Sequence, residues 1–266
     1  MKPSLTVESS IWREHASRGP RAVATEVPVA FVYDGGTEAV MLASPVDLED
    51  FALGFSLNDG VIASPDDVTA LEIVEVEQGI ELRMLLRQRN RDALVTRRRR
   101  RAGPVGCGLC GVESIEEALP RLPRIVTSLS LSADEAIAAM RALAPLQALN
   151  AETRAVHAAA FYVPGEGIVA VREDIGRHNA LDKLAGALVR AGRHAGSGAI
   201  LMTSRVSVEL VQKAAMMGAP ILAAVSAPTS LALREAEAAN ITVVGIVRDD
   251  GLEVFTHPER VSMHAR

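Results

Sequence analysis

Cysteine is almost absent from this sequence, because the 266 residues include only Cys107 and Cys110. Two cysteines three positions apart cannot form the set of disulfides that joins distant segments in small secreted domains. Two free thiols are consistent with a reducing compartment. We therefore expect the pair to serve chemistry rather than to hold the fold together.

Long apolar runs are also missing. No stretch of about 18 apolar residues occurs, as a membrane-spanning helix would need. The polar N-terminus lacks the apolar centre of a secretory signal, so we expect a cytoplasmic protein without membrane contact. The formal net charge of −5 argues against a surface that binds nucleic acid in general, because phosphate contacts need a positive face.

Aromatic residues make up only 3% of the chain, so Ala, Val, Leu and Ile supply most of the 48% that is hydrophobic. This composition is typical of sheets covered by helices and favours an α/β fold. We expect four segments. They are a tail at 1–22, a small α+β domain at 23–90, a basic, glycine-rich flexible arm at 91–115 and a larger α/β domain at 116–266.

Two hairpins are predicted in the small domain. Apolar, β-prone runs at 26–33 and 38–43 surround a glycine turn, and runs at 70–77 and 80–86 surround Gly79.

Two helices have clear start signals. The segment 44–47 predicts a helix that runs to Gly60, with Pro45 at the first helical position. Ser132 is predicted to cap a second helix at 133–143.

Strands and helices alternate from about residue 154 onwards, which predicts a sheet with helices packed on it, often on both faces. The predicted strands are 156–163, 168–173, 199–204, 221–226 and 241–247, and the predicted helices are 177–191, 206–217 and 229–239.

Positive charge gathers ahead of the cysteines. From Arg83 to Arg101 there are nine arginines and one acid, Asp92. Neighbouring positive charge stabilises a thiolate over a thiol, and a thiolate can accept sulfur as a persulfide while the second cysteine resolves or holds it. Alternatives are half of a zinc site, a thioredoxin-like redox pair, a nucleic-acid-binding arm and a solvated linker.

A second polar cluster begins the helix predicted at 177–191. Arg177, His178 and Asn179 follow a strand directly, with Lys183 one turn further on. Backbone N–H groups at a helix start attract phosphate, so these residues are candidates for binding an anion. The alternative is that Asp174 merely caps this helix.

Similar strand-to-helix junctions follow the next two strands, at Ser204, Arg205 and Ser207, and at Ser226. In such sheets ligands gather where strands end. We expect the three junctions to share one crevice, in which small hydroxyls donate hydrogen bonds and the arginine grips phosphate. The turn 248–251 is a further candidate, because an aspartate there can accept hydrogen bonds from a guanine edge.

The chain resembles the formate dehydrogenase accessory sulfurtransferases, the FdhD family, over roughly residues 24–262. The resemblance rests on segments in family order: EVPVAFVYDG, DLEDFALGFSLNDG, CGLCG, VHAAAF, EDIGRHNALDK, RVSVELVQKAA, SAPTSLAL and ITVVGIVRDDG. It implies a cytidine-deaminase-like three-layer sandwich beside the smaller N-terminal α+β domain, and a homodimer.

The resemblance also implies a function. Such a protein takes persulfide sulfur from a cysteine desulfurase and delivers it to the bis-molybdopterin guanine dinucleotide cofactor of formate dehydrogenase. The cofactor is then a bound substrate, with no permanently bound cofactor or metal. The persulfide belongs on the CGLCG cysteines, with Cys107 favoured. The implied contacts to the dinucleotide include Ile246, Val247, Arg248, Asp249, Asp250 and Gly251.

Departures from the family pattern put details of the pocket in question. Thr203-Ser204-Arg205 replaces Ser-Gly-Arg, and Thr153-Arg154-Ala155 replaces Thr-Gly-Gly. Zinc deaminase chemistry is excluded, because His157 is not followed by the H-x-E glutamate and no cysteine lies downstream. His157 is a candidate pocket residue or a core histidine. A chaperone that binds the cofactor without changing it is the alternative function.

Overall fold

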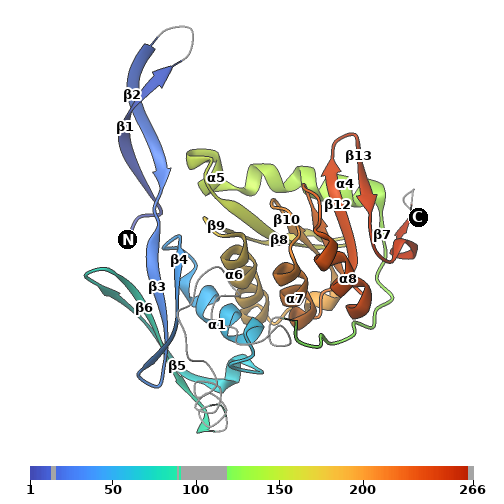
Figure 1. The fold of residues 1–266 in the computed structure, drawn as a ribbon, viewed down its shortest axis with the longest axis horizontal. Coiled ribbons are helices and arrows are strands. Elements are labelled where there is room, and N and C mark those ends of the chain that lie inside the picture. The colour runs from blue at the N-terminus through green and yellow to red at the C-terminus, as the bar shows by residue number, and fades with distance from the viewer. Residues whose placement is uncertain (13–15, 89, 91–118, 263–266) are drawn as a thin grey trace.

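The computed structural model describes residues 1–12, 16–88, 90 and 119–262. Figure 1 shows two sheets side by side, with helices α1 (Leu48–Asn58) and α6 (Arg177–Arg190) between them. The described residues form a mixed α/β fold with six α-helices. The α/β class expected from composition is thus confirmed at this level.

A four-stranded sheet forms the smaller unit, in the order β4-β3-β6-β5. Its strands are β3 (Val27–Tyr33), β4 (Gly36–Ala43), β5 (Val68–Val76) and β6 (Gly79–Leu86). Both predicted hairpins are present, since β3 pairs antiparallel with β4 and β5 with β6. The central pair β3 and β6 is parallel, which joins the two hairpins into one sheet.

Helix α1 covers this sheet with aromatic side chains. Phe51 and Phe55 are buried against Phe31 of β3, with ring centroids 4.9 and 4.0 Å away. The prediction that Pro45 opens the helix is wrong. The Val46 N–H donates to the Ser44 carbonyl at 2.8 Å, which folds Pro45 into a γ-turn, and the helix begins only after Asp47.

The first 24 residues contain a long two-stranded ribbon, β1 (Ser4–Trp12) paired with β2 (Ala16–Ala24). Figure 1 shows it standing away from the body. Its base is attached to α5 (Ala148–Thr153), where Arg21 donates to the Thr153 carbonyl at 2.8 Å. Most of the predicted tail, 1–22, is therefore regular structure. Leu5 and Val7 alternate with polar residues in β1, but both are exposed and most of the ribbon is polar, so the sequence signal for these strands is weak.

A six-stranded sheet forms the larger unit, in the order β13-β12-β11-β10-β8-β9. The parallel strands β10, β11 and β12 lie at its centre, and the β8–β9 hairpin and β13 are antiparallel to them. The strands are β8 (His157–Val163), β9 (Gly167–Asp174), β10 (Ala199–Met202), β11 (Ile221–Ala224), β12 (Thr242–Arg248) and β13 (Gly251–Val254).

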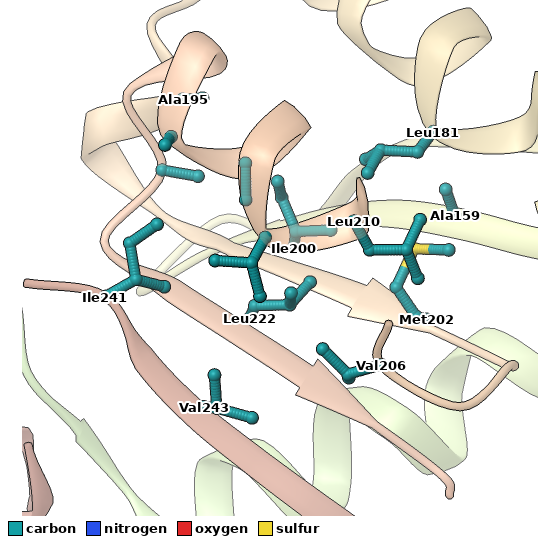
Figure 2. Close-up of a cluster of buried hydrophobic side chains, with 14 of the residues drawn as sticks. Ala159, Leu181, Ala195, Ile200, Met202, Val206, Leu210, Leu222, Ile241 and Val243 are labelled. Atoms are coloured by element: carbon teal, nitrogen blue, oxygen red, sulfur yellow. The ribbon is translucent and has the colours of Figure 1, made fainter. Parts of the chain in front are cut away.

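Helices cover both faces of this sheet. On one face α6, α7 (Val208–Met217) and α8 (Ser230–Ala239) bury a core to which Leu181 and Leu210 contribute, drawn in Figure 2. On the other face α4 (Ala133–Leu143) packs its apolar residues on the sheet. The predicted α4 bounds are confirmed, with Ser132 and Glu135 forming the capping box.

Several short elements were not predicted from the sequence. They are β7 (Leu131–Ser132), β14 (Val261–Ser262) and the 3₁₀ turns Pro65–Asp67, Ala144–Leu146, Ala195–Ser197 and Pro258–Arg260. Among the described residues, no helix is long and apolar enough to cross a membrane.

Helices α1 and α6 approach each other at two glycines. A Cβ on Gly54 would lie 1.7 Å from the Asp182 carbonyl oxygen, and one on Gly186 would lie 1.9 Å from the Asp50 carbonyl oxygen. Real Cβ atoms do not come so close to backbone atoms, so only glycine permits this packing. The contact joins the two units through their backbones.

We predict that Gly54→Ala lowers the free energy of unfolding by at least about 2 kcal/mol, even though alanine favours helix, because the added methyl group forces the two backbones apart. Denaturant unfolding measures the change. Gly196→Ala is the matched control, since its Cβ would meet its nearest atom at an ordinary 3.5 Å. Equal stability of the two variants would contradict the prediction.

Candidate functional site

The carboxyl ends of the parallel strands β10, β11 and β12 lie at the same end of the large sheet. That the three predicted junctions share one crevice stays a prediction. The start of β8 lies at the same edge, because Thr203 after β10 accepts from the Ala158 N–H at 2.8 Å. Ile246 in β12 donates to the Ser226 carbonyl at 3.3 Å. The strand-end site is defined here by polar residues of this edge: His157, Arg177, His178, Ser204, Ser207, Glu209 and Ser226.

Four buried polar atoms of this site make no hydrogen bond. They are Arg177 Nε, His178 Nε2, Ser207 Oγ and Glu209 Oε2, and only one other such side-chain atom, in Thr25, is found in the described chain. A buried polar group without a partner costs about 1–3 kcal/mol. The concentration of these atoms at one place indicates a surface that a ligand completes.

The four atoms belong to the first turns of two helices that start side by side. Arg177 and His178 begin α6, Ser207 is the N-cap of α7, and Glu209 lies in its first turn. His178 Nε2 and Glu209 Oε2 are 3.8 Å apart, which is close enough for an ion pair and too long for a hydrogen bond. The pair leaves hydrogen-bonding capacity on both residues.

Electrostatics fix the charge of two residues in the site. The His178 imidazole, and with it the Ser207 hydroxyl, lowers the pKa of Glu209 from 4.5 to about 2, although burial opposes this. Burial, followed by the charges of Arg177 and His178, lowers the pKa of His157 below 6.5. At neutral pH the site therefore holds a carboxylate and a neutral His157.

Asn179 and Lys183, predicted to bind the cofactor, turn inward instead of joining these four atoms. Lys183 Nζ is fully buried and donates to Asp174 Oδ2 at 2.7 Å and to the Ser44 carbonyl at 2.9 Å. The Asn179 amide donates to Asp174 Oδ1 and to the Leu42 carbonyl. These contacts attach β4 and its following loop to α6.

Two further buried carboxylates extend this attachment. Asp182 accepts from Asn58 at 2.8 Å and from Lys213 at 2.7 Å. Asp50 of α1 binds Arg172 at 2.7 Å and Arg190 at 2.8 Å. In EDIGRHNALDK, Asp174, Asn179, Asp182 and Lys183 thus contribute to the attachment of the two units, whereas Arg177 and His178 belong to the strand-end site. Glu173 accepts hydrogen bonds from the backbone of α5.

The last-strand turn is separated into buried and exposed parts. Val247 is 1% exposed and belongs to the core on the α4 face. Ile246 has a φ of 51° at a β-bulge, which brings it beside Ser226. Arg248, Asp249, Asp250 and Gly251 form the hairpin tip, where Asp249 pairs with Arg141 at 2.9 Å.

The remaining predicted residues lie at the edge of the site. The Ser204 hydroxyl is buried and donates to the Arg205 carbonyl, and the Arg205 side chain is exposed. No group of three or more His, Cys, Asp or Glu side chains that could hold a metal occurs in the part of the chain that the structure describes.

Cys107, Cys110 and the arginines at 91–101 lie outside the described residues. The described chain stops before them in the smaller unit and resumes after them beside the larger one. Asn90 donates to the Val61 carbonyl, and Ile125 donates to the carbonyl of Ala239, just before β12. The segment that contains the cysteines therefore joins two described parts of the chain, each attached by a hydrogen bond to the rest of the protein.

A family model described as the FdhD/NarQ family matches residues 24–262. The chain belongs to the FdhD/NarQ family. The family resemblance predicted from the sequence is confirmed, and most of the β1–β2 ribbon precedes the matched range.

Three relatives named sulfur carrier protein FdhD match nearly the whole chain. The Agrobacterium fabrum protein is 54% identical over 244 residues, with 91% of this chain and 90% of the relative covered. The Brucella abortus protein is 56% identical over 242 residues, covering 91% and 90%. The Cupriavidus necator protein is 49% identical over 261 residues, covering 98% and 91%.

A solved structure is similar as well. It is a crystal structure of a candidate formate dehydrogenase accessory protein from Desulfotalea psychrophila, with a TM-score of 0.77 and 25% sequence identity. The similarity covers 98% of this chain and 100% of that chain. The relatives and this structure all match the part of the chain that forms both sheets.

Glu209 was not among the residues predicted from the sequence. It lies within the RVSVELVQKAA segment, but an acidic residue in the first turn of a helix is common because it complements the helix dipole. Only its position facing His178, with one oxygen left without a partner, distinguishes it.

We predict that Lys183→Met lowers the free energy of unfolding by about 3–5 kcal/mol, because it leaves the Asp174 carboxylate buried without its cation. Calorimetry measures this loss. Arg141→Met is the control, since the Arg141–Asp249 pair is exposed by 64% and 82% and should contribute at most about 1 kcal/mol. A stable Lys183 variant would mean that this lysine does not join the units.

We predict that the stability contributed by ionised Glu209 depends on pH. Because folding lowers its pKa from 4.5 to about 2, the contribution is complete above about pH 4.5 and is lost as the pH falls towards 2. The difference in unfolding free energy between the wild type and Glu209→Gln should be about 1 kcal/mol at pH 7 and shrink by pH 3. A difference independent of pH would refute the assignment.

Proposed function

We propose that this protein is a sulfur carrier of formate dehydrogenase maturation. It holds sulfur as a persulfide on Cys107 or Cys110 and delivers it to the bis-molybdopterin guanine dinucleotide cofactor. Relatives up to 56% identical bear the name sulfur carrier protein FdhD, which supports the sulfur half of the proposal. The cofactor half rests on one observation, the four buried atoms without partners at the strand-end site.

The proposed sulfur transfer has a loading step, a delivery step and a reduction. In the delivery step the two cysteines supply both electrons. A thiolate of the pair attacks the outer sulfur of a cysteine desulfurase persulfide, a new S–S bond forms, and the desulfurase leaves as a thiolate. For delivery, the second cysteine attacks the inner sulfur, and sulfide leaves towards the cofactor. The cysteine pair is then a disulfide, which a dithiol reductant returns to two thiols.

The positive charge near the cysteines supports their role in sulfur transfer. The nine arginines between Arg83 and Arg101 stabilise a thiolate nearby and attract an anionic cofactor or an acidic face of the desulfurase. A thiol brought close to so many guanidinium groups is a better nucleophile at neutral pH than an isolated cysteine.

The length of the chain between the fixed ends is compatible with transfer across the molecule. Residues 91–118 number 28, and an extended segment of that length spans at most roughly 100 Å. The covalent geometry therefore permits the cysteines to meet a desulfurase and the strand-end site.

The strand order β9-β8-β10-β11-β12, with helices on both faces, supports assignment of the larger unit to a cytidine-deaminase-like three-layer sandwich. The fold would serve cofactor binding without deamination. We further propose that the protein acts in the cytoplasm as a homodimer that hands the cofactor to formate dehydrogenase and binds neither membrane nor nucleic acid.

A cofactor chaperone without sulfur chemistry is the second candidate. It is favoured by one feature, the four buried polar atoms without partners, which a bound cofactor could satisfy without any thiol. The two functions share cofactor binding and differ in whether the cysteines are required.

We predict that the wild type, incubated with a cysteine desulfurase and cysteine, gains about 32 Da, the mass of one sulfur atom, on the peptide with the cysteine pair. The Cys107→Ala, Cys110→Ala double variant should gain nothing and fail to support formate dehydrogenase activity. Mass spectrometry of the peptide measures the first effect, with omission of cysteine as the control. Full activity in the double variant would favour the chaperone.

A further inference from the structure

We propose that Ser44, a residue of the smaller unit, positions the first turn of α6 and so holds Arg177 and His178 in place for the cofactor. This inference rests on the proposed function, because it takes the strand-end site to bind the cofactor. It gives the smaller unit a part in binding, although none of the residues that define the strand-end site belongs to that unit.

Helix α6 begins without a side-chain cap of its own. Its N-cap is Gly176, which has no side chain to accept from the free N–H groups of the first turn. Asp174 takes over this role from two residues upstream, since its Oδ1 accepts from the Gly176 N–H at 2.8 Å and from the Asn179 amide at 2.9 Å. The path of the chain into Arg177 therefore depends on where the Asp174 carboxylate is held.

Ser44 holds this carboxylate and the residue that follows it. The Ser44 N–H donates to Asp174 Oδ2 at 2.9 Å, and the Ser44 hydroxyl accepts from the Ile175 N–H at 3.2 Å. The Ser44 carbonyl accepts from Lys183 Nζ at 2.9 Å. All three polar groups of this fully buried residue are thus bonded to the β9–α6 junction or to α6 itself.

The end of β4 fixes Ser44 on both sides. The preceding residue, Ala43, is buried in the core of the smaller unit. The following residue, Pro45, restricts Ser44 to extended conformations, because the proline ring clashes with a helical residue before it. The Leu42 carbonyl accepts a further hydrogen bond from Asn179 at 2.8 Å. The end of β4 is therefore a rigid support for the start of α6.

The position of this turn matters at the strand-end site. Arg177 and His178 follow Gly176 directly, and His178 Nε2 lies 3.8 Å from Glu209 of α7. Arg177 Nε and His178 Nε2 make no hydrogen bond within the described chain. A ligand can bond to both only if α6 starts at the right place, and a misplacement of only about 1 Å weakens function strongly. Ser44 is thus a positioning residue that acts through these two side chains.

A purely structural role of Ser44 predicts a different result. Its hydroxyl would then stabilise the fold like any other buried hydroxyl, and its removal would leave the affinity of the folded protein unchanged. Ser56 of α1 provides the matched comparison, because it is equally buried. Its hydroxyl lies 2.7 Å from the Tyr33 hydroxyl and donates to the Ala52 carbonyl at 2.6 Å, entirely within the smaller unit.

Titration calorimetry of the full-length protein with GDP, which carries the guanosine and pyrophosphate of the dinucleotide, tests the assignment. Ser44→Ala should weaken binding about fivefold or more, because the Ile175 N–H loses its acceptor and the turn is no longer fixed. Ser44→Thr keeps a hydroxyl and should bind GDP more tightly than Ser44→Ala. The control Ser56→Ala should bind within about twofold of the wild type.

A double-mutant cycle measures whether Ser44 acts through Arg177 and His178. In a variant with Arg177→Ala and His178→Ala, Ser44→Ala should change GDP affinity by less than about twofold, because the turn has no side chain left to position. Denaturant unfolding should show the same loss of stability from Ser44→Ala in both backgrounds, since the hydrogen bond to Ile175 is present in both.

Amide hydrogen exchange at Gly176 gives a readout that needs no ligand. Its N–H bonds to Asp174 Oδ1 in the turn that Ser44 supports. This amide should exchange at least about tenfold faster in Ser44→Ala than in Ser56→Ala, because only the first substitution loosens the turn. If Arg177→Ala and His178→Ala together abolish binding, this comparison decides, and equal exchange overturns positioning.

The outcomes separate this inference from the proposed function. Weaker GDP binding by Ser44→Ala that disappears without Arg177 and His178 supports positioning. If Ser44→Ala binds GDP as tightly as the wild type, or loses the same factor in both backgrounds, positioning is overturned and cofactor delivery stands. If the wild type does not bind GDP, the cofactor half of the proposed function is overturned, and this inference with it.

Discussion

The contact between α1 and α6 is the constraint on which the arrangement of this protein depends. Gly54 and Gly186 let two helix backbones touch, and buried Asp50, Asp174 and Asp182 find their cations across or beside that contact. If the units separated, Asp50 would lose both of its arginines, which would leave a buried carboxylate without a cation. Lys183 and Asp182 would lose their hydrogen bonds to Ser44 and Asn58 of the small unit. The small sheet and the large sheet are consequently one rigid support for the strand-end site.

This contact also explains why the polar residues of one sequence segment have two different roles. In EDIGRHNALDK the residues Asp174, Asn179 and Lys183 face the small unit, and their hydrogen bonds lie within the protein. Arg177 and His178, between them in sequence, face the other way with atoms left unpaired. A dense polar motif can therefore be half structural, and only the direction of each side chain separates the two halves.

Sequence patterns predicted much of this fold because its strands and helices are strongly periodic. The α4 bounds and both small-domain hairpins are confirmed. Pro45 was misplaced because a local γ-turn competes with helix initiation. Glu209 was missed because acidic residues are common in the first turn of a helix. It is distinguished only by its position opposite His178, which lies on another helix. The cysteine chemistry was predicted from the spacing of Cys107 and Cys110, the neighbouring arginines and the family resemblance, and it stays a prediction.

The β1–β2 ribbon has a consequence for how the molecule behaves among its copies. No further strand pairs with the ribbon among the described residues, and unpaired strand edges invite pairing with other chains. Pro20 of β2 lies opposite Glu8 and has no N–H, so it cannot donate a backbone hydrogen bond to a neighbouring strand. Charged Arg18 and Arg21 flank it. The proline and the charged residues thus disfavour strand pairing between copies of the protein, although the ribbon extends away from the body.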